Sequence, residues 1–470
     1  MPNKISVVSL GCPKNLVDSD KLTQRLISNG FSYLNMPEAA DIILVNTCGF
    51  IEDAKKESIE EILRLADIKK GLRGQKAKGT RKLVAFGCLA KRYREQLLKE
   101  IPEIDAIFGV GEEEKIVEYC KGLKRRHGDT ETRRSKDSLF LRFTPSPIHP
   151  FSSYAYLKIA DGCNKKCSYC VIPSIRGAYR SISPDNILKD AEHHIQAGVK
   201  ELILVAQDTA CYGNDLNGYD ISRLLKDICS ISGDFWVRLL YAYPDSISNS
   251  LINTIAGENK ICKYLDIPLQ HSEDRILKLM GRKGTRKGYL SLIKKIRHNI
   301  PDIALRTTFI VGFPSETEEE LNSLIDFIEN VRFDKLGVFK YSKEEGTPAS
   351  KLSGHITKAL KNKRFNMIMQ HQARISLEKN KELVGRQFKA VIDEVNDNIA
   401  VCRLYSHAPE IDGVVIINSA EERKSSSAEV EKYKTSELPR FLASSLKAGS
   451  FISVKITDAH DYDLNGIMVR

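Results

Sequence analysis

Three cysteines within eight residues constrain this chain more than any other feature of its sequence. They are Cys163, Cys167 and Cys170, and their spacing is C-x3-C-x2-C. Three thiolates this close can wrap one metal cluster, whereas a four-iron cube that only carries electrons takes four cysteine ligands. A cube held by this triplet would therefore keep one iron open for chemistry.

Zinc and disulfides are the alternatives at this triplet. Structural zinc takes four closed ligands, and no fourth ligand lies near the triplet in sequence. An odd group of cysteines, in a chain with only 11 cysteines among 470 residues, does not suit a disulfide framework. We therefore favour an iron–sulfur cluster, with a zinc site or unreactive thiols as the alternatives.

A second group of cysteines follows three strand-like runs in the first 125 residues. Apolar runs alternate there with segments of helical spacing, which predicts a doubly wound parallel sheet; the runs are 5–10, 41–46, 82–86 and 106–110. Cys12, Cys48 and Cys88 each come just after one of the first three runs. Ligands bind beyond the carboxyl ends of parallel strands, so we expect these cysteines to converge and hold a second cluster with an open iron. Three unrelated buried cysteines would not be expected to share this phase.

The middle of the chain repeats the alternation of strand and helix. Six strand-like runs are separated by helical patterns, and they lie at 155–159, 201–205, 236–240, 264–268, 303–311 and 335–339. Six units are too few for an eight-fold barrel. We therefore predict a partial (βα)6 barrel with its site at the carboxyl ends of the strands.

The last part of the chain changes to short β-rich runs with glycines and polar turns. The runs at 388–392, 399–404, 413–417 and 451–456 predict a small five-stranded barrel of the OB type. We accordingly expect domains at 1–125, 151–382, including a connecting helix, and 383–470, with a polar, proline-punctuated linker at 126–150.

Charge is distributed unevenly over these parts. The whole chain carries +11, which suggests an anionic partner, but residues 383–470 hold 11 Lys and Arg against 13 Asp and Glu. An acidic module favours a basic protein partner over nucleic acid. The basic stretches 69–82 and 124–134 are candidates for an rRNA contact, although charge runs are usually solvated surface. No long apolar span is present, and residues 1–10 suit a first strand better than a signal peptide, so we expect a cytoplasmic protein without a membrane partner.

The triplet, with Tyr169 before its last cysteine, resembles the radical S-adenosylmethionine superfamily. The resemblance implies that the open iron binds S-adenosylmethionine, whose cleavage gives a radical, so that no side chain is expected to act as a catalytic residue. It also implies cofactor contacts at strand ends, with Gln207 and Asp208 near the methionine amino group and Gly312 near the adenine. Arg238, at a further strand end, is the fourth candidate for cofactor binding.

The segments around the other three cysteines resemble the amino-terminal domain of the methylthiotransferase family. They are residues 11–19 (GCPKNLVDS), 46–51 (NTCGFI) and 87–93 (GCLAKRY), and the first is most similar to the RimO-type branch. Arg176 and Gly177 look like the family's Arg-Gly segment. The family carries a TRAM domain at its carboxyl end, where residues 408–413 match the ribosomal-protein branch and residues 403–407 depart from it.

This resemblance implies a methylthio transfer to the β-carbon of an aspartate in a small-subunit ribosomal protein. The cofactors implied are two [4Fe–4S] clusters and S-adenosylmethionine, the latter as radical source and methyl donor. The partners implied are the ribosomal protein or the assembled small subunit, and an electron donor such as a flavodoxin or ferredoxin. The alternatives are a methylthiotransferase acting on a tRNA adenosine and a metal-binding module without catalysis. On the first hypothesis, both cysteine triads should open into one shared cavity.

Overall fold

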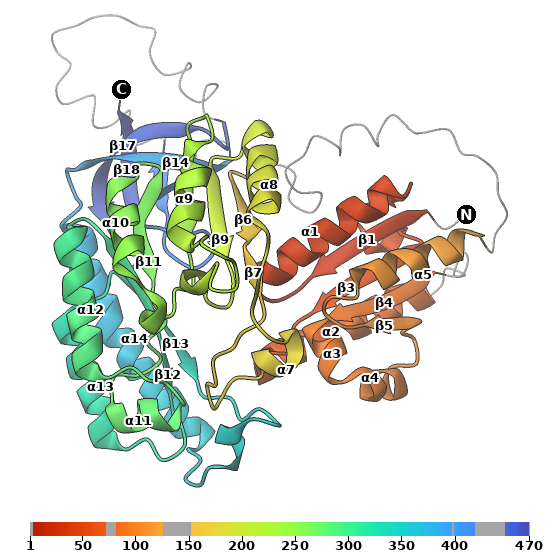
Figure 1. Ribbon diagram of the computed structural model, residues 1–470, viewed down its shortest axis with the longest axis horizontal. Coiled ribbons are helices and arrows are strands. Elements are labelled where there is room, and N and C mark those ends of the chain that lie inside the picture. The colour runs from red at the N-terminus through yellow and green to blue at the C-terminus, as the bar shows by residue number, and fades with distance from the viewer. Residues whose placement is uncertain (1–2, 72–80, 126–151, 397–398, 419–446, 470) are drawn as a thin grey trace, which may run out of the picture. The chain divides into compact units, whose positions relative to one another are not determined.

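The structure is a computed structural model that describes residues 3–71, 81–125, 152–396, 399–418 and 447–469 (Figure 1). The whole of the predicted linker, 126–150, and most of both basic stretches lie outside these residues. The chain forms two compact units. The cysteine unit comprises Met1–Pro150, Ala160–Arg180 and Ser342–Ser350, and the barrel unit comprises Phe151–Ile159, Ser181–Tyr341 and Lys351–Arg470.

A five-stranded parallel sheet forms the centre of the cysteine unit. Its strands run in the order β2-β1-β3-β4-β5, with bounds β1 Lys4–Ser9, β2 Ser32–Tyr33, β3 Ile42–Thr47, β4 Lys82–Gly87 and β5 Ala106–Phe108. The helices around it are α1 Pro13–Ser28, α2 Glu52–Lys70, α3 Cys88–Arg92, α4 Arg94–Glu100 and α5 Glu113–Arg125. This order is that of a doubly wound sheet, and the predicted fold of this part is confirmed.

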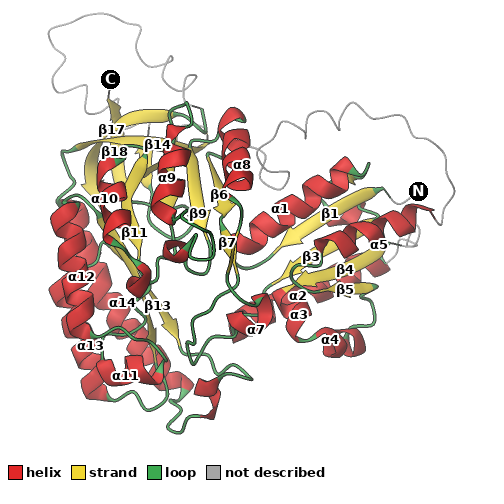
Figure 2. Cartoon of the chain, viewed as in Figure 1, coloured by secondary structure: helices red, strands yellow, loops and turns green. Residues whose placement is uncertain are grey.

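Alternating side chains of the central strands build a core on each face of this sheet. Ile43 and Val45 of β3 pack in one core with Leu65 of α2, while Leu44 packs on the other face with Leu22 of α1. Each such buried aliphatic side chain stabilises the fold by about 1.5–3 kcal/mol. Helices on both faces thus bury the strands and leave the strand ends and their loops for the site (Figure 2).

The barrel unit contains the six parallel strands that the sequence predicts. They are neighbours in chain order, β13-β12-β11-β10-β9-β6, with bounds β6 Tyr154–Lys158, β9 Glu201–Val205, β10 Trp236–Leu239, β11 Ile261–Asp266, β12 Ala304–Val311 and β13 Lys335–Lys340. The helices are α8 Pro184–Gln196, α9 Ile221–Ser230, α10 Asn249–Gly257, α11 Asp274–Leu279, α12 Arg286–Asn299, α13 Glu318–Val331 and α14 Lys358–Lys381. An open sheet with β6 and β13 at its edges confirms the partial (βα)6 barrel.

A closed five-stranded β-barrel completes this unit. Its strands follow the order β14-β15-β16-β18-β17, with bounds β14 Gln387–Asn396, β15 Ile399–Leu404, β16 Val415–Asn418, β17 Phe451–Ala459 and β18 Leu464–Val469. The predicted number of strands is confirmed, although the position of β18 was not located, because Asn465 and Gly466 interrupt its apolar run. Among the described helices, none is both long enough and apolar enough to cross a membrane.

Candidate functional site

The first cysteine triad lies at the carboxyl ends of three adjacent strands. Cys12 precedes the first residue of α1, Cys48 follows β3 directly, and Cys88 begins α3 directly after β4. Because β1, β3 and β4 are neighbours in the sheet, the predicted phase of the cysteines places all three on one edge. Strand order reverses at β1 and β3, which is where open α/β sheets bind their ligands.

Two glycines allow the loops of this triad to approach closely. A Cβ on Gly11 would lie 2.9 Å from the Sγ of Cys48, and one on Gly87 would lie 2.2 Å from the Oδ1 of Asn46. Both glycines also have positive φ values, +90° and +98°, which side chains disfavour. Burial, followed by the neighbouring Cys12 and Cys88 thiolates, raises the pKa of Cys48 to about 11. The thiols of Cys12 and Cys88 therefore lie near that of Cys48 at this edge of the sheet.

The second triad belongs to the same unit, in the loop between β7 (Ala160–Asp161) and α7 (Ile172–Arg176). Cys163 Sγ accepts from the backbone N–H of Lys165 at 3.4 Å, and Cys170 Sγ accepts from that of Ile172 at 3.5 Å. Burial, followed by Cys167 and Cys163, raises the pKa of Cys170 to about 12. Amide donors aimed at sulfur favour the thiolate form that binds metals.

Neither triad has the geometry of a mononuclear zinc site. Among the described residues, no three His, Cys, Asp or Glu side chains are grouped so that they could hold a metal ion. Zinc would draw its sulfurs to about 2.3 Å from one centre, whereas each iron of a cube takes a thiolate of its own. Three cysteines in each set can give one thiolate to each of three irons of a cube, whereas structural zinc would need a fourth closed ligand.

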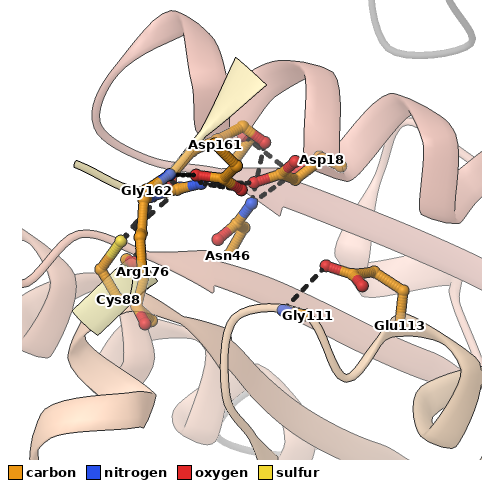
Figure 3. A network of polar contacts seen from close by, with 12 residues as sticks. Asp18, Asn46, Cys88, Gly111, Glu113, Asp161, Gly162 and Arg176 are labelled. Carbon is orange, nitrogen blue, oxygen red and sulfur yellow. Dashed lines mark hydrogen bonds and ion pairs between the residues drawn. The ribbon is translucent and has the colours of Figure 1, made fainter. Parts of the chain in front are cut away.

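Arg176, the last residue of α7, contacts Cys88 of the first triad and Asp161, which precedes the loop of the second triad (Figure 3). Its Nη1 donates to both carboxylate oxygens of Asp161 at 3.0 Å and to Asp18 at 3.2 Å. Its Nη2 donates to Asn15 Oδ1 at 2.7 Å and lies 3.7 Å from the Sγ of Cys88. One side chain thus contacts a cysteine of the first triad and the residue two positions before Cys163.

The electrostatics of this network keep the guanidinium charged. Burial alone would lower the pKa of Arg176, but Asp18, Cys88 and Asp161 outweigh it and raise that pKa above its usual value. Burial raises the pKa of Cys88, and Arg176 acts against that rise. The sequence indicated an Arg-Gly segment here but not its contacts with Cys88 and Asn15, which lie 88 and 161 positions from Arg176.

Three of the four predicted cofactor contacts lie at strand ends of the barrel unit. Gln207 follows β9, and both polar atoms of its buried amide lack a hydrogen-bond partner. Asp208 beside it accepts from Tyr243 N–H at 3.2 Å and from the Ser246 hydroxyl at 2.8 Å. Gly312 directly follows β12, with φ +72°. The Gln207 amide therefore has its hydrogen-bonding groups available for a polar cofactor, as the sequence predicts.

Arg238 requires a correction, because the structure does not bring it together with Gln207 and Asp208. Its Nε donates to Glu201, the first residue of β9, at 2.5 Å, and its Nη1 donates to the carbonyl of Tyr405 at 2.7 Å. Arg403 also donates to Glu201. Burial would raise the pKa of Glu201, but the two guanidiniums outweigh it and lower that pKa. These are the contacts of a structural ion pair, which joins the six-stranded sheet to the closed barrel.

Comparison with known proteins identifies the family. Three family models match in series: the uncharacterized protein family UPF0004 at residues 4–109, the radical SAM superfamily at 157–328 and the TRAM domain at 384–469. A protein of Thermodesulfovibrio yellowstonii named ribosomal protein uS12 methylthiotransferase RimO is 52% identical over 468 residues, 99% of both chains. A protein of Acetivibrio thermocellus with the same name is 41% identical and covers 100% of this chain and 99% of its own. The chain belongs to the RimO family.

Solved structures of low sequence identity support the fold of this RimO family member. The radical S-adenosylmethionine methyltransferase TsrM from Kitasatospora setae has a TM-score of 0.53 at 13% identity and covers 85% of this chain and 81% of its own. The cobalamin-dependent radical enzyme OxsB has a TM-score of 0.50 at 16% identity, covering 78% and 56%. The predicted radical SAM barrel and TRAM domain are confirmed. The RimO relatives also favour the ribosomal-protein branch over the tRNA alternative.

The segment Ser342–Ser350 also belongs to the cysteine unit, and its contacts near the two cysteine loops were not predicted from the sequence. Glu344 binds Lys55 at 2.8 Å and Arg92 at 2.9 Å, and Arg92 also donates to the carbonyl of Gly49, next to Cys48. In the same segment, Ala349 N–H donates to the carbonyl of Ser168, between Cys167 and Cys170. No local signal could have found contacts that span up to 289 residues.

Proposed function

We propose that this chain attaches a methylthio group to the β-carbon of an aspartate in ribosomal protein uS12. The observation that carries the proposal is the presence of two strand-end and loop cysteine triads in one compact unit of a RimO family chain. An electron-transfer cluster takes four cysteines, so two sets of three suit two clusters that each keep a site for chemistry.

The six cysteines would hold two [4Fe–4S] clusters. Cys12, Cys48 and Cys88 would hold one, and Cys163, Cys167 and Cys170 would hold the other. When bound, these clusters and S-adenosylmethionine supply radical formation, the methyl group and the sulfur that is transferred. No side chain is proposed as a catalytic residue, and a cavity shared by the two triads stays a prediction.

The protein's own residues would bind and orient S-adenosylmethionine. Gln207 would offer its partnerless amide to the polar end of S-adenosylmethionine, beside Asp208, whose carboxylate Tyr243 and Ser246 hold in place. Gly312 would contact the adenine through its backbone; a Cβ there would lie 2.4 Å from the Cγ of Lys361, so the close packing requires a glycine. Arg238 is not included, since its guanidinium is committed to Glu201 and Tyr405.

The proposed partners are uS12, free or in the assembled small subunit, and an electron donor such as a flavodoxin or ferredoxin. The acidic balance of residues 383–470 suits a basic ribosomal protein. We retain as proposals the domain bounds 1–125, 151–382 and 383–470, the linker 126–150, a cytoplasmic location and an rRNA contact by the basic stretches.

Mass analysis of uS12 and of bulk tRNA from cells with and without this chain tests the proposal. We expect uS12 from the deletion cells to lack about 46 Da, the mass of CH3S replacing H, while tRNA is unchanged. Loss of a methylthio-adenosine from tRNA with uS12 unaltered would instead support the tRNA alternative. If neither molecule changed, the chain would have to be regarded as a binding module.

A further inference from the structure

Arg176 is a buried, paired charge whose position the cluster ligands alone do not explain. Its side chain is 1% exposed, and it faces the carboxylates of Asp18 and Asp161 as well as the Sγ of Cys88. Burying a guanidinium costs several kcal/mol unless each of its donors is used. The fold meets this cost by pairing both terminal nitrogens of the guanidinium with carboxylates, the Asn15 amide oxygen and the Cys88 sulfur.

Arg176 contacts the first triad directly, at Cys88, and reaches the loop of the second triad only through Asp161. On one side, Asn15 and Asp18 lie in the first turns of α1, which Cys12 precedes, and the Nδ2 of Asn15 in turn donates to the Leu10 carbonyl at 2.9 Å. On the other side, Asp161 precedes the loop of Cys163. Ile175 of α7, the helix that carries Arg176, and Val171, which precedes this helix, also pack on Cys88.

A donor to a ligating sulfur has a known physical effect. Hydrogen bonds and positive charge near cluster sulfurs stabilise the reduced, more negative cluster and so raise its reduction potential. The planar guanidinium can bind a carboxylate and a thiolate at once, whereas the single ammonium of lysine cannot reproduce this fork. Arg176 can therefore act on the first cluster while it orients the second cysteine loop.

We propose that Arg176 is a positioning residue shared by the two cluster sites, which raises the reduction potential of the cluster on Cys12, Cys48 and Cys88. It does so through its N–H donor to the Cys88 thiolate, and it fixes the Cys163 loop through Asp161. This inference rests on the proposed function, because it takes Cys88 as a cluster ligand.

The test uses the full-length chain with Cys163, Cys167 and Cys170 all changed to Ala, which retains only the first triad. After anaerobic reconstitution, the reduced fraction of the remaining cluster is measured against potential by electron paramagnetic resonance. We expect Arg176→Gln to lower the ratio of reduced to oxidised cluster at a fixed potential about tenfold, equivalent to about 59 mV for one electron. Arg176→Lys, which keeps the charge but not the fork, should lower it about threefold.

Arg94→Gln is the matched control, since Arg94 is a half-exposed arginine of the same unit that binds Glu112. It should leave the ratio unchanged. A folded Arg176→Gln or Arg176→Lys protein whose ratio equals that of the parent would overturn the inference, and Arg176→Lys decides if Arg176→Gln does not fold. If the parent itself binds no cluster on Cys12, Cys48 and Cys88, the proposed function fails instead.

Discussion

The two units of this protein each bury an arginine network, and the two networks differ in what the guanidinium finally contacts. Arg176 and Arg238 are 1% and 0% exposed, and both bind carboxylates. Arg176 reaches a cysteine sulfur, whereas Arg238 reaches a backbone carbonyl of the TRAM domain. Burial and charge pairing are therefore common to a structural joint and to a site. The two networks differ in the partner that is not a carboxylate, which is the Cys88 sulfur for Arg176 and the Tyr405 carbonyl for Arg238.

The largest expected effect comes from removing the sulfur of the first network. Cys88→Ala should lower methylthiolation of uS12 at least about 100-fold, because a cluster ligand is lost. It should still form 5′-deoxyadenosine, because the second triad is intact. Product mass and 5′-deoxyadenosine are measured on the same reaction.

Cys120→Ala is the control for this change. Cys120 is a buried cysteine of the same unit that packs in the core with Ile116 and Val117. It should retain activity. Equal losses in the two variants would mean that burial, not cluster binding, explains the importance of Cys88.

The next largest effect is expected from removing the carboxylate of Glu201, which pairs with Arg238 and Arg403. Glu201→Gln leaves Arg238 and Arg403 buried without their shared counter-charge, so we expect the barrel unit to lose about 3–5 kcal/mol of unfolding free energy. The fluorescence of Trp236, the single tryptophan, should report this transition, since its ring lies 4.9 Å from that of Phe451 in the TRAM domain.

Asp234→Asn is the comparison for Glu201→Gln. Asp234 binds Lys389, which also links the sheet to the TRAM domain, but both side chains are largely exposed. Its loss should cost less than about 1 kcal/mol. A similar loss of unfolding free energy in both variants would contradict the idea that the buried ion pair of Glu201 joins the sheet to the TRAM domain.

The buried pair of Glu316 and Arg364 differs from the other two networks because its contribution to stability should depend on pH. Burial raises the pKa of Glu316 to about 7, although Arg364 and the N–H groups of Gly312 and Phe313 act against the rise. Because the folded pKa exceeds the ordinary value of 4.5, the protonated carboxyl stabilises the fold below pH 4.5, and this contribution is lost as the pH rises through 7. The loss is at most about 3 kcal/mol.

Unfolding of the wild type and of Glu316→Gln, measured from pH 4.5 to 8, checks this sign. The stability of the wild type relative to the variant should fall as the pH rises. Burial also lowers the pKa of His271 to about 3, which acts with the opposite sign, but this histidine is present in both proteins and cancels in the difference. A difference that is constant or that rises with pH would show that Glu316 is ionised throughout.

The smallest expected effect concerns Gln207, which the sequence already predicted as a cofactor contact. Gln207→Ala should weaken S-adenosylmethionine binding about tenfold, or about 1.4 kcal/mol, because one amide loses its ligand hydrogen bonds. Gln372→Ala is the control, since the buried Gln372 amide donates to the Phe333 carbonyl and faces no predicted ligand. Anaerobic calorimetry measures both. Unchanged binding in Gln207→Ala would remove Gln207 from the site.

The sequence predicted those features that local patterns determine. Cys12, Cys48 and Cys88 each follow an apolar run, and this was enough to predict that they lie at one edge of the sheet, because parallel strands bring their carboxyl ends together. The six barrel strands were likewise recognised from periodicity. The setting of Arg238 was not predictable, because its partner Glu201 lies 37 positions away and at the start of a strand. For the same reason the contacts of Arg176 and Glu344 emerged only from the folded chain.

Iron counting combined with Mössbauer spectroscopy tests the central claim, that each cysteine triad holds its own cluster. We expect about eight irons in the reconstituted wild type. In one triple variant Cys12, Cys48 and Cys88 are changed to Ala, and in the other Cys163, Cys167 and Cys170 are; each should hold about four irons. About four irons in the wild type, or a triple variant that loses all its iron, would contradict two independent cluster sites.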